Sequence, residues 1–319
     1  MMTIDVFASA NQILPGVIDL RRKIHANPEL GNQLPETTAA VLNELSDLGL
    51  EIRASKETTS LIATLKGEGV GPRILLRGDM DALPMPEDND LSFASRNANK
   101  MHACGHDAHT AMLVGAARLL HENKEHVNGT VDFFFQTGEE GYYGAKVVLD
   151  EGMFEAPYSP DAIFALHITP LMDSGKFTGR PGPILAAADT WKIKVTGKGG
   201  HASMPHDALD PIPVACEIVQ ALQHMVVSRI NAFNPVVLTT TKIEAGTTSN
   251  VIPESVDMLG TLRSTSERSR AKAHEGIKRI ATQIAMAHEM EAEVELSLGY
   301  PVTVNPVSYT HLTLPTIYS

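Results

Sequence analysis

The sequence predicts an α/β fold in its first part and a smaller α+β domain in its second part. In residues 1–185, short continuous apolar segments alternate with segments of helical period, which is typical of a sheet covered by helices on both faces. In residues 186–299, the predicted elements follow the order β-α-β-β-α-β, which indicates a split βαβ sandwich. The length of 319 residues also fits two domains better than one.

The first domain opens with two predicted helices. Residues 14–29 have a helical pattern that ends near Pro28, and residues 35–49 follow, with Pro35 suited to a first turn and Gly49 to a C-terminal cap. Apolar strands are predicted at residues 60–67, 73–79, 130–137 and 161–168. Two further helices are predicted at residues 107–123 and after Gly144.

The second domain is predicted to contain four strands and two helices. The strands are expected at residues 189–197, 235–246, 255–265 and 292–300, and the helices at residues 209–226 and 266–290. Residues 179–188 are rich in Gly, Pro and Ala and are the expected hinge between the domains. Residues 300–319 are expected to start a return to the first domain. Because residues 308–319 do not look like a continuation of it, we expect a chain that is truncated or spliced at this end.

Composition excludes several functional classes. There are 26 Lys and Arg residues against 38 Asp and Glu residues, a net charge of −12, which disfavours nucleic acid as the main partner. No stretch approaches the length of a membrane span, and the N-terminus has no basic residue before Arg21 and does not read as a signal peptide. The two cysteines, Cys104 and Cys216, cannot form a disulfide framework, so we expect a cytoplasmic protein.

The densest chemical signal lies in residues 101–110, MHACGHDAHT. Three histidines, His102, His106 and His109, surround Cys104 just before a predicted helix. Thiolate and imidazole are good ligands for zinc-like divalent metals, and Cys104 and His106 are close enough in sequence to reach one ion. The alternative is a polar helix start with an incidental cysteine, but the clustering of possible ligands favours a metal site.

Acidic and histidine side chains follow three predicted strands. Glu139 and Glu140 come after the strand at residues 130–137, where one could bind metal while the other holds a water molecule; an isolated pair of this kind would be a solvated turn. His167 ends the last strand of the first domain and, taken alone, would be a hydrogen-bonded core histidine.

Asp79 and Asp81 end the strand at residues 73–79 and either support metal ligands or are ordinary polar residues. Because α/β proteins build their sites at one edge of the sheet, we expect all of these side chains to converge there.

The second domain adds three candidates. His201 lies in a glycine-flanked loop, where it could donate a hydrogen bond to an oxyanion or simply be a surface histidine. Asn250 and Arg263 could bind a substrate carboxylate, Arg263 through its planar guanidinium. Either could instead be ordinary strand-end polarity.

Six motifs occur along the chain in this order: RGDMDALP, MHACGHDAHT, TGEEG, FALHITP, GKGGHASMPH and TTSNVIP. As a set they resemble the aminoacylase/carboxypeptidase-type metallopeptidase family, in the amidohydrolase branch that includes hippurate hydrolases and indole-acetyl-amino-acid hydrolases. The resemblance runs from about Leu20 to Asn305. It implies a catalytic metal-binding domain, residues 1–185, with an inserted dimerisation or lid domain, residues 186–299, and a homodimer formed through the latter.

The resemblance also implies roles for individual residues. Two divalent ions per subunit (Zn, Mn, Co or Ni) would be bound, with Cys104 as a bridging thiolate where relatives use Asp. The implied metal ligands are Cys104, His106, Glu140 and His167; the implied catalytic residues are Glu139 as base, His201 as stabiliser of the intermediate, and Asp81 as the supporting acid; Asn250 and Arg263 would bind the substrate. Family members carry a further segment with a fifth metal-ligating histidine, and His311 in the tail is not assigned to that role.

The expected reaction is hydrolysis of an N-acyl amino acid to a carboxylic acid and a free amino acid. Two other hypotheses are open. One makes Cys104 a nucleophile with a histidine as its base, and the other makes the chain an inactive metal-binding or dimerisation fragment. Within the same family, a dipeptidase or an acetyl- or succinyl-diaminopimelate deacylase is a further alternative.

Overall fold

The computed structural model describes residues 5–306 and divides into two compact units, Met1–Ser174 (unit 1) and Gly175–Ser319 (unit 2). Each unit has its own hydrophobic core. The expected hinge, residues 179–188, falls within unit 2, and its hinge role stays a prediction, as do the domain boundaries. The tail at residues 308–319, which contains His311, lies outside the described residues.

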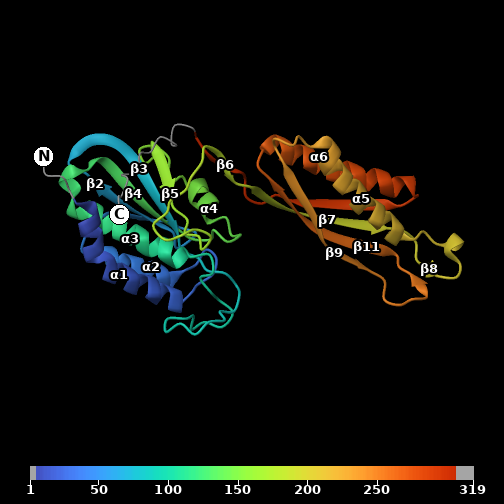
Figure 1. Ribbon diagram of the computed structural model, residues 1–319, viewed down its shortest axis with the longest axis horizontal. Helices are drawn as coiled ribbons and strands as arrows, with labels where there is room; N and C mark the ends of the chain where they lie inside the picture. The colour runs from blue at the N-terminus through green and yellow to red at the C-terminus, as the bar shows by residue number, and fades with distance from the viewer. Residues whose placement is uncertain (1–4, 307–319) are drawn as a thin grey trace. The chain divides into compact units, whose positions relative to one another are not determined.

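Unit 1 contains a five-stranded mixed sheet in the order β1-β2-β4-β3-β5 (Figure 1). The strands are β1 (Glu51–Ala54), β2 (Leu61–Lys66), β3 (Gly69–Asp79), β4 (Asn128–Gln136) and β5 (Ala162–Ala165). Strands β4, β3 and β5 run parallel, whereas β1 and β2 are antiparallel to their neighbours. The short strand β1, which is mostly exposed, was not predicted.

Helices cover both faces of this sheet. They are α1 (Val6–Ala26), α2 (Pro35–Leu45), α3 (His106–Glu122), the short 3₁₀ turn η1 (Lys124–His126) and α4 (Gly144–Asp150). Successive side chains of a strand point to opposite faces, so Phe133 and Phe135 pack with α1, α2 and α3, while Phe134 packs with Val148 of α4. This double burial confirms the predicted α/β class.

Helix α1 begins earlier than predicted. The carboxylate of Asp5 accepts a hydrogen bond from the main-chain N–H of Ala8 and caps the helix, which continues through Pro15. The prediction had started the helix at residue 14, beside this proline. A side-chain cap supplies the missing partner for an early N–H group, so the helix gains two turns before the proline.

Unit 2 contains a four-stranded antiparallel sheet in the order β12-β7-β11-β9. Its elements are β7 (Ala187–Thr196), α5 (Pro211–Arg229), β9 (Val236–Ala245), β11 (Ser255–Ser264), α6 (Glu267–Ala287) and β12 (Glu291–Ser297), the predicted β-α-β-β-α-β order. Along β7, Trp191, Ile193 and Val195 are buried against the helices, while Lys192 and Lys194 are exposed. One face of the sheet therefore packs on α5 and α6.

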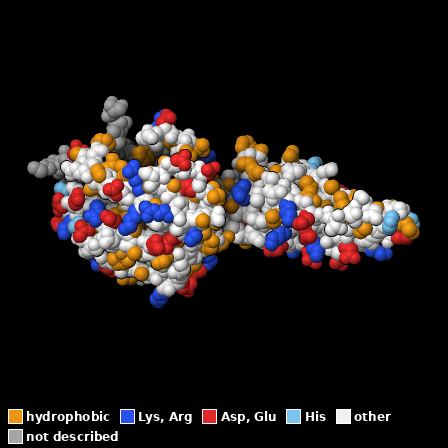
Figure 2. Space-filling view, turned by 90° about the horizontal axis from the view of Figure 1, so that it is seen from below, with side chains coloured by type: hydrophobic (Ala, Val, Ile, Leu, Met, Phe, Trp, Pro, Cys, Tyr) orange, Lys and Arg blue, Asp and Glu red, His pale blue; other side chains and the backbone are white. Residues whose placement is uncertain are grey.

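Four short strands and one turn in unit 2 were not predicted. Strand β6 (Gly182–Leu185) pairs with β13 (Thr303–Asn305), and β8 (Gly200–His201) pairs with β10 (Val251–Ile252); η2 (Pro205–Asp207) is a 3₁₀ turn. Strands of two to four residues are too short to show a period in the sequence. In residues 5–306, no helix combines the length and apolar character needed to cross a membrane. On the face shown in Figure 2, acidic and basic side chains are interspersed.

Candidate metal centre

The parallel strands β3, β4 and β5 end at one edge of the unit 1 sheet, and helix α3 begins beside them. Gly105 precedes α3 with φ +86°, a left-handed conformation that glycine adopts without strain. A Cβ atom at this position would lie 2.4 Å from Cδ1 of Ile168. Glycine therefore serves two needs here, a tight turn between Cys104 and His106 and a close approach of the segment that carries His167.

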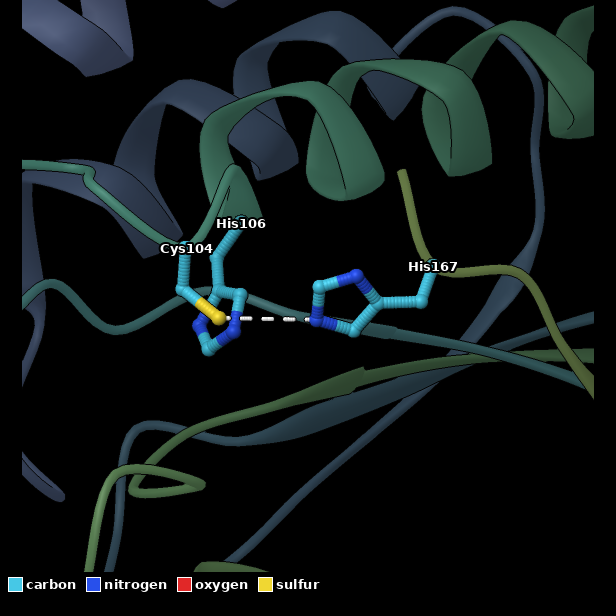
Figure 3. A group of neighbouring side chains, drawn as sticks. All are labelled: Cys104, His106 and His167. Atoms are coloured by element: carbon cyan, nitrogen blue, oxygen red, sulfur yellow. Dashed lines mark hydrogen bonds between the residues drawn. The ribbon is translucent and has the colours of Figure 1, made fainter. Parts of the chain in front are cut away.

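Cys104, His106 and His167 form a group with the reach of a metal site. Their ligand atoms all lie within 4.8 Å of one another. The Sγ atom of Cys104 is 3.4 Å from Nε2 of His167, although the two residues are 63 positions apart in the chain (Figure 3). The structure thus brings together three of the four predicted metal ligands.

His106 offers one nitrogen to this site. Its Nδ1 atom lies 2.8 Å from the main-chain oxygen of Asp81. A carbonyl oxygen only accepts hydrogen bonds, so Nδ1 donates and Nε2 is the nitrogen left for a metal ion. This Nε2 atom is buried and has no hydrogen-bond partner among residues 5–306. A buried nitrogen without a partner calls for a ligand, and a metal ion fits it.

The charges around His106 favour a cation. Burial lowers the pKa of His106, but the hydrogen bond with Asp81, together with Cys104 and the carboxylate of Asp79, raises it overall to about 11. An environment that holds a proton on the ring this firmly also attracts a metal ion, which would replace that proton.

Glu139 and Glu140 face the same nitrogen. Each has a carboxylate oxygen 3.9 Å from Nε2 of His106, and the side chains are 37% and 20% exposed. Their main-chain N–H groups both donate to the carboxylate of Asp81, one to each oxygen, at 2.9 Å. Burial, followed by the nearby carboxylates of Glu140 and Asp79, raises the pKa of Glu139. A carboxylate with a raised pKa is suited to proton transfer.

Asp79 and His109 lie behind His106. The Nδ1 atom of His109 is 2.6 Å from Asp79, and Nη1 of Arg77 is 2.7 Å from the other oxygen. Burial raises the pKa of Asp79, but the hydrogen bond with His109 and the charge of Arg77 outweigh it and hold the pKa well below its usual range. Asp79, His106 and His109 form a second group with metal-site spacing.

Two residues of the predicted cluster point elsewhere. The carboxylate of Asp107 contacts Nδ1 of His25 at 2.9 Å and Nε of Arg21 at 3.0 Å. His102 is buried beside His25, with the ring centroids 6.2 Å apart, and burial lowers the pKa of His102 to about 4. His25 also contacts Glu87 at 3.0 Å. Sequence reasoning missed His25 and Arg21, since a polar residue in a helical segment has no distinctive pattern.

In unit 2, His201 and Asn250 lie side by side. Strand pairing sets His201 opposite Val251, and the main-chain N–H of Ala202 donates to the oxygen of Asn250 at 3.0 Å. His201 is exposed, and its Nδ1 atom accepts a hydrogen bond of 3.2 Å from the N–H of Ser203. The link between His201 and Asn250 follows from the unpredicted strands β8 and β10.

Arg263 is not beside them. It lies exposed on β11, paired with Ala188 and Val237, eight residues after Ser255 at the start of the strand. At roughly 3.4 Å per residue, these eight residues span about 27 Å. The three unit 2 candidates are therefore divided between the two ends of β11.

Comparison with known proteins places these features in a family. Residues 75–313 match the model of peptidase family M20/M25/M40. Thermostable carboxypeptidase 2 of Saccharolobus solfataricus is 40% identical over 293 residues, 91% of this chain and 74% of that protein. The IAA-amino acid hydrolase ILR1-like 2 of Arabidopsis thaliana is 38% identical over 94% of this chain and 68% of its own length. The N-acetyl-L-cysteine deacetylase of Bacillus subtilis is 38% identical over 93% of this chain and 70% of its own length.

Solved structures have the same fold. A crystal structure from methicillin-resistant Staphylococcus aureus has a TM-score of 0.90 and 32% identity, covering 95% of this chain and 80% of that one. The YXEP protein of Bacillus subtilis, described as a dinuclear metal-binding peptidase of the M20 family, has a TM-score of 0.80 and 34% identity, covering 95% of this chain and 77% of that one.

Proposed function

Because this chain belongs to peptidase family M20/M25/M40, we propose that it hydrolyses the amide bond of N-acyl amino acids, hippurate among them, to a carboxylic acid and a free amino acid. As a member of the family, it is a metallo-amidohydrolase, which acts on amide bonds. The finer proposal is supported by two relatives whose names specify an amino acid that carries an acyl group, an IAA-amino acid and N-acetyl-L-cysteine. The observation that carries it is the convergence of Cys104, His106 and His167 beside Glu139.

We propose that Cys104, His106, His167 and Glu140 hold two divalent ions of Zn, Mn, Co or Ni. The thiolate, imidazole and carboxylate donors of this set suit such ions, and the partnerless Nε2 atom of His106 is directed at the place where one would lie. When bound, such ions polarise the acyl oxygen and lower the pKa of a water molecule.

Glu139 is the proposed general base. Its main chain is held by Asp81, and its carboxylate lies on the same side as Nε2 of His106. The raised pKa of Glu139 suits a group that takes a proton from water and returns it to the leaving amine. Asp81 is proposed to keep Glu139 and Glu140 in place rather than to react.

His201, Asn250 and Arg263 are proposed to act on the substrate. His201 would stabilise the oxyanion of the intermediate through a hydrogen bond, and Asn250 and Arg263 would bind the substrate carboxylate. The pairing of His201 with the Asn250 segment supports a joint role for the first two. The separation along β11 implies that Arg263 contacts a different part of the substrate or none.

We also propose that the protein is a homodimer joined through residues 186–299, that residues 179–188 are a hinge, and that it acts in the cytoplasm. The cytoplasmic location is supported by Cys104 and Cys216, which are both free thiols. Size-exclusion chromatography with light scattering tests the dimer, and a dimer that persists in a variant lacking residues 186–299 would contradict the proposed interface.

The test of the function combines metal content with turnover. We expect two metal ions per chain and hydrolysis of hippurate and N-acetyl amino acids that a chelator abolishes and added Zn or Mn restores. Hydrolysis that resists the chelator but is blocked by iodoacetamide would favour Cys104 as a nucleophile. Fewer than two ions without turnover would favour the inactive fragment, and faster cleavage of dipeptides would favour the dipeptidase.

A further inference from the structure

We propose that His109 is a positioning residue: it holds the backbone next to His167 so that Nε2 of His167 faces Cys104. The proposal deepens the function given above and rests on it in one respect, namely that Cys104, His106 and His167 bind metal.

Two hydrogen bonds determine the state of the His109 ring. The main-chain N–H of Ile168 donates to Nε2 of His109 at 3.0 Å. A main-chain N–H can only donate, so this nitrogen uses its lone pair, and the proton of the neutral ring must sit on Nδ1. That Nδ1 atom is 2.6 Å from the carboxylate of Asp79, which accepts its hydrogen bond. His109 and Asp79 are both buried, and Arg77 holds Asp79 from the other side.

The same peptide segment orients His167. Ile168 directly follows His167, and its carbonyl oxygen lies 2.6 Å from Nδ1 of His167. A carbonyl only accepts, so Nδ1 of His167 donates and its Nε2 lone pair is directed at the sulfur of Cys104, 3.4 Å away (Figure 3). The rings of His109 and His167 also meet edge to face, with centroids 4.6 Å apart. His109 therefore fixes the N–H of Ile168 while its C=O fixes His167.

This arrangement argues against a metal ion on His109. Asp79, His106 and His109 have the spacing of a metal group. To serve as a ligand, however, His109 would have to give up either its bond from Ile168 or its bond to Asp79, and both are buried. A nitrogen engaged by a backbone N–H has no lone pair left for a metal ion. The support for His167 and the metal site are thus separate roles.

The test compares four variants of the full chain. His109→Ala removes both hydrogen bonds. His109→Gln keeps a side-chain carbonyl that can accept from Ile168 and serves as the conservative rescue. His167→Gln removes the proposed ligand, and His126→Gln replaces an exposed histidine of η1 as the matched control. Zinc affinity is measured by competition with a chromophoric chelator, stoichiometry is measured at saturation, and circular dichroism checks the fold of each variant.

We expect His109→Ala to bind zinc about 10- to 100-fold more weakly with unchanged stoichiometry at saturation, which is the usual cost of removing a group that orients a metal ligand. His109→Gln should recover part of this loss, and His126→Gln should match the wild type. Unchanged affinity in His109→Ala would overturn the proposal. Loss of a whole metal equivalent at saturation would overturn it too, because His109 would then be a ligand.

A second readout needs no metal. Long-range ¹H–¹⁵N spectra of the metal-free protein, assigned with His167→Gln, should show His167 with its proton on Nδ1 in the wild type and mixed tautomers in His109→Ala. If the wild type fails to hydrolyse N-acyl amino acids or to bind zinc, the proposed function fails, while this spectrum still decides the role of His109. An unchanged His167 tautomer in His109→Ala would overturn that role.

Discussion

The carboxylate of Asp81 accepts a hydrogen bond of 2.9 Å from the main-chain N–H of Glu139, 58 residues further along the chain. Its second oxygen accepts from Glu140 in the same way, and its main-chain oxygen lies 2.8 Å from Nδ1 of His106. One buried residue at the end of β3 therefore holds both glutamates and one histidine of the candidate metal centre. Asp81 acts through its neighbours, so its loss should disturb several of them together.

Replacing Asp81 with Asn should lower both stability and metal binding. An amide can accept from one glutamate N–H but turns its NH₂ group toward the other, so one hydrogen bond to a charged group is lost. We expect a loss of about 1.5–3 kcal/mol in the free energy of unfolding. Urea unfolding of the metal-free protein measures it, with the exposed Asp88→Asn as control. Equal stability of the Asp81 variant and the control would contradict this role.

Glu139→Gln should remove turnover and leave metal binding intact. Glutamine cannot take a proton from water, and general base catalysis is worth about 100- to 10,000-fold in rate. The matched variant Glu140→Gln should instead weaken metal binding. Steady-state kinetics and metal content distinguish the two. Loss of metal from Glu139→Gln, with retention in Glu140→Gln, would show that the two roles are reversed.

Gly105→Ala should destabilise the protein and its metal centre. The left-handed φ of +86° costs a non-glycine residue about 1–2 kcal/mol, and the new methyl group would overlap the Ile168 side chain. Gly16→Ala is the control, because Gly16 lies inside α1 with open space around it. That change should stabilise the protein by about 0.5–1 kcal/mol. Thermal unfolding should move in opposite directions for the two variants, and a shared direction would refute the explanation.

The contact between His25 and Asp107 should make stability depend on pH. The hydrogen bond with Asp107 raises the pKa of His25 above 6.5 despite the opposing effect of burial. A raised folded-state pKa means that this stabilisation is complete below pH 6.5 and is lost as the pH rises through the folded-state pKa. The stability difference between wild type and His25→Gln should therefore shrink from pH 6 upward. Urea unfolding of metal-free protein across this range measures it, and a difference that is constant or grows would contradict the assignment.

If His201 serves the active site of a partner subunit, two inactive variants should restore activity together. Glu139→Gln and His201→Ala, unfolded and refolded as a mixture, would form hybrid dimers in which one site has both functional residues. Random pairing in a two-fold dimer predicts about a quarter of wild-type activity. Each variant refolded alone is the control. A mixture that stays as inactive as its components would show that His201 acts within its own subunit or not at all.

Much of this architecture could be predicted from the sequence because its signals are local. The apolar run that contains Phe133, Phe134 and Phe135 predicts a strand buried on both faces, and the structure has it. Cys104 and His106 are two residues apart at a helix start, so their shared position follows from chain geometry alone. The β-α-β-β-α-β order of unit 2 is also visible in the periodicity of its segments.

Tertiary structure decided which of the neighbouring polar residues face one another. Within residues 101–110, His102 and Asp107 turn to His25 of α1, while His106 turns to Asp81 and Glu139. The segment that carries His167 reaches Cys104 only because β5 pairs with β3. Periodicity reports which side of its own element a residue occupies, whereas its partner is set by the packing of elements far apart in the chain. The sequence by itself determined the elements and the residue types of the site; the pairing of strands and helices determined which atoms meet.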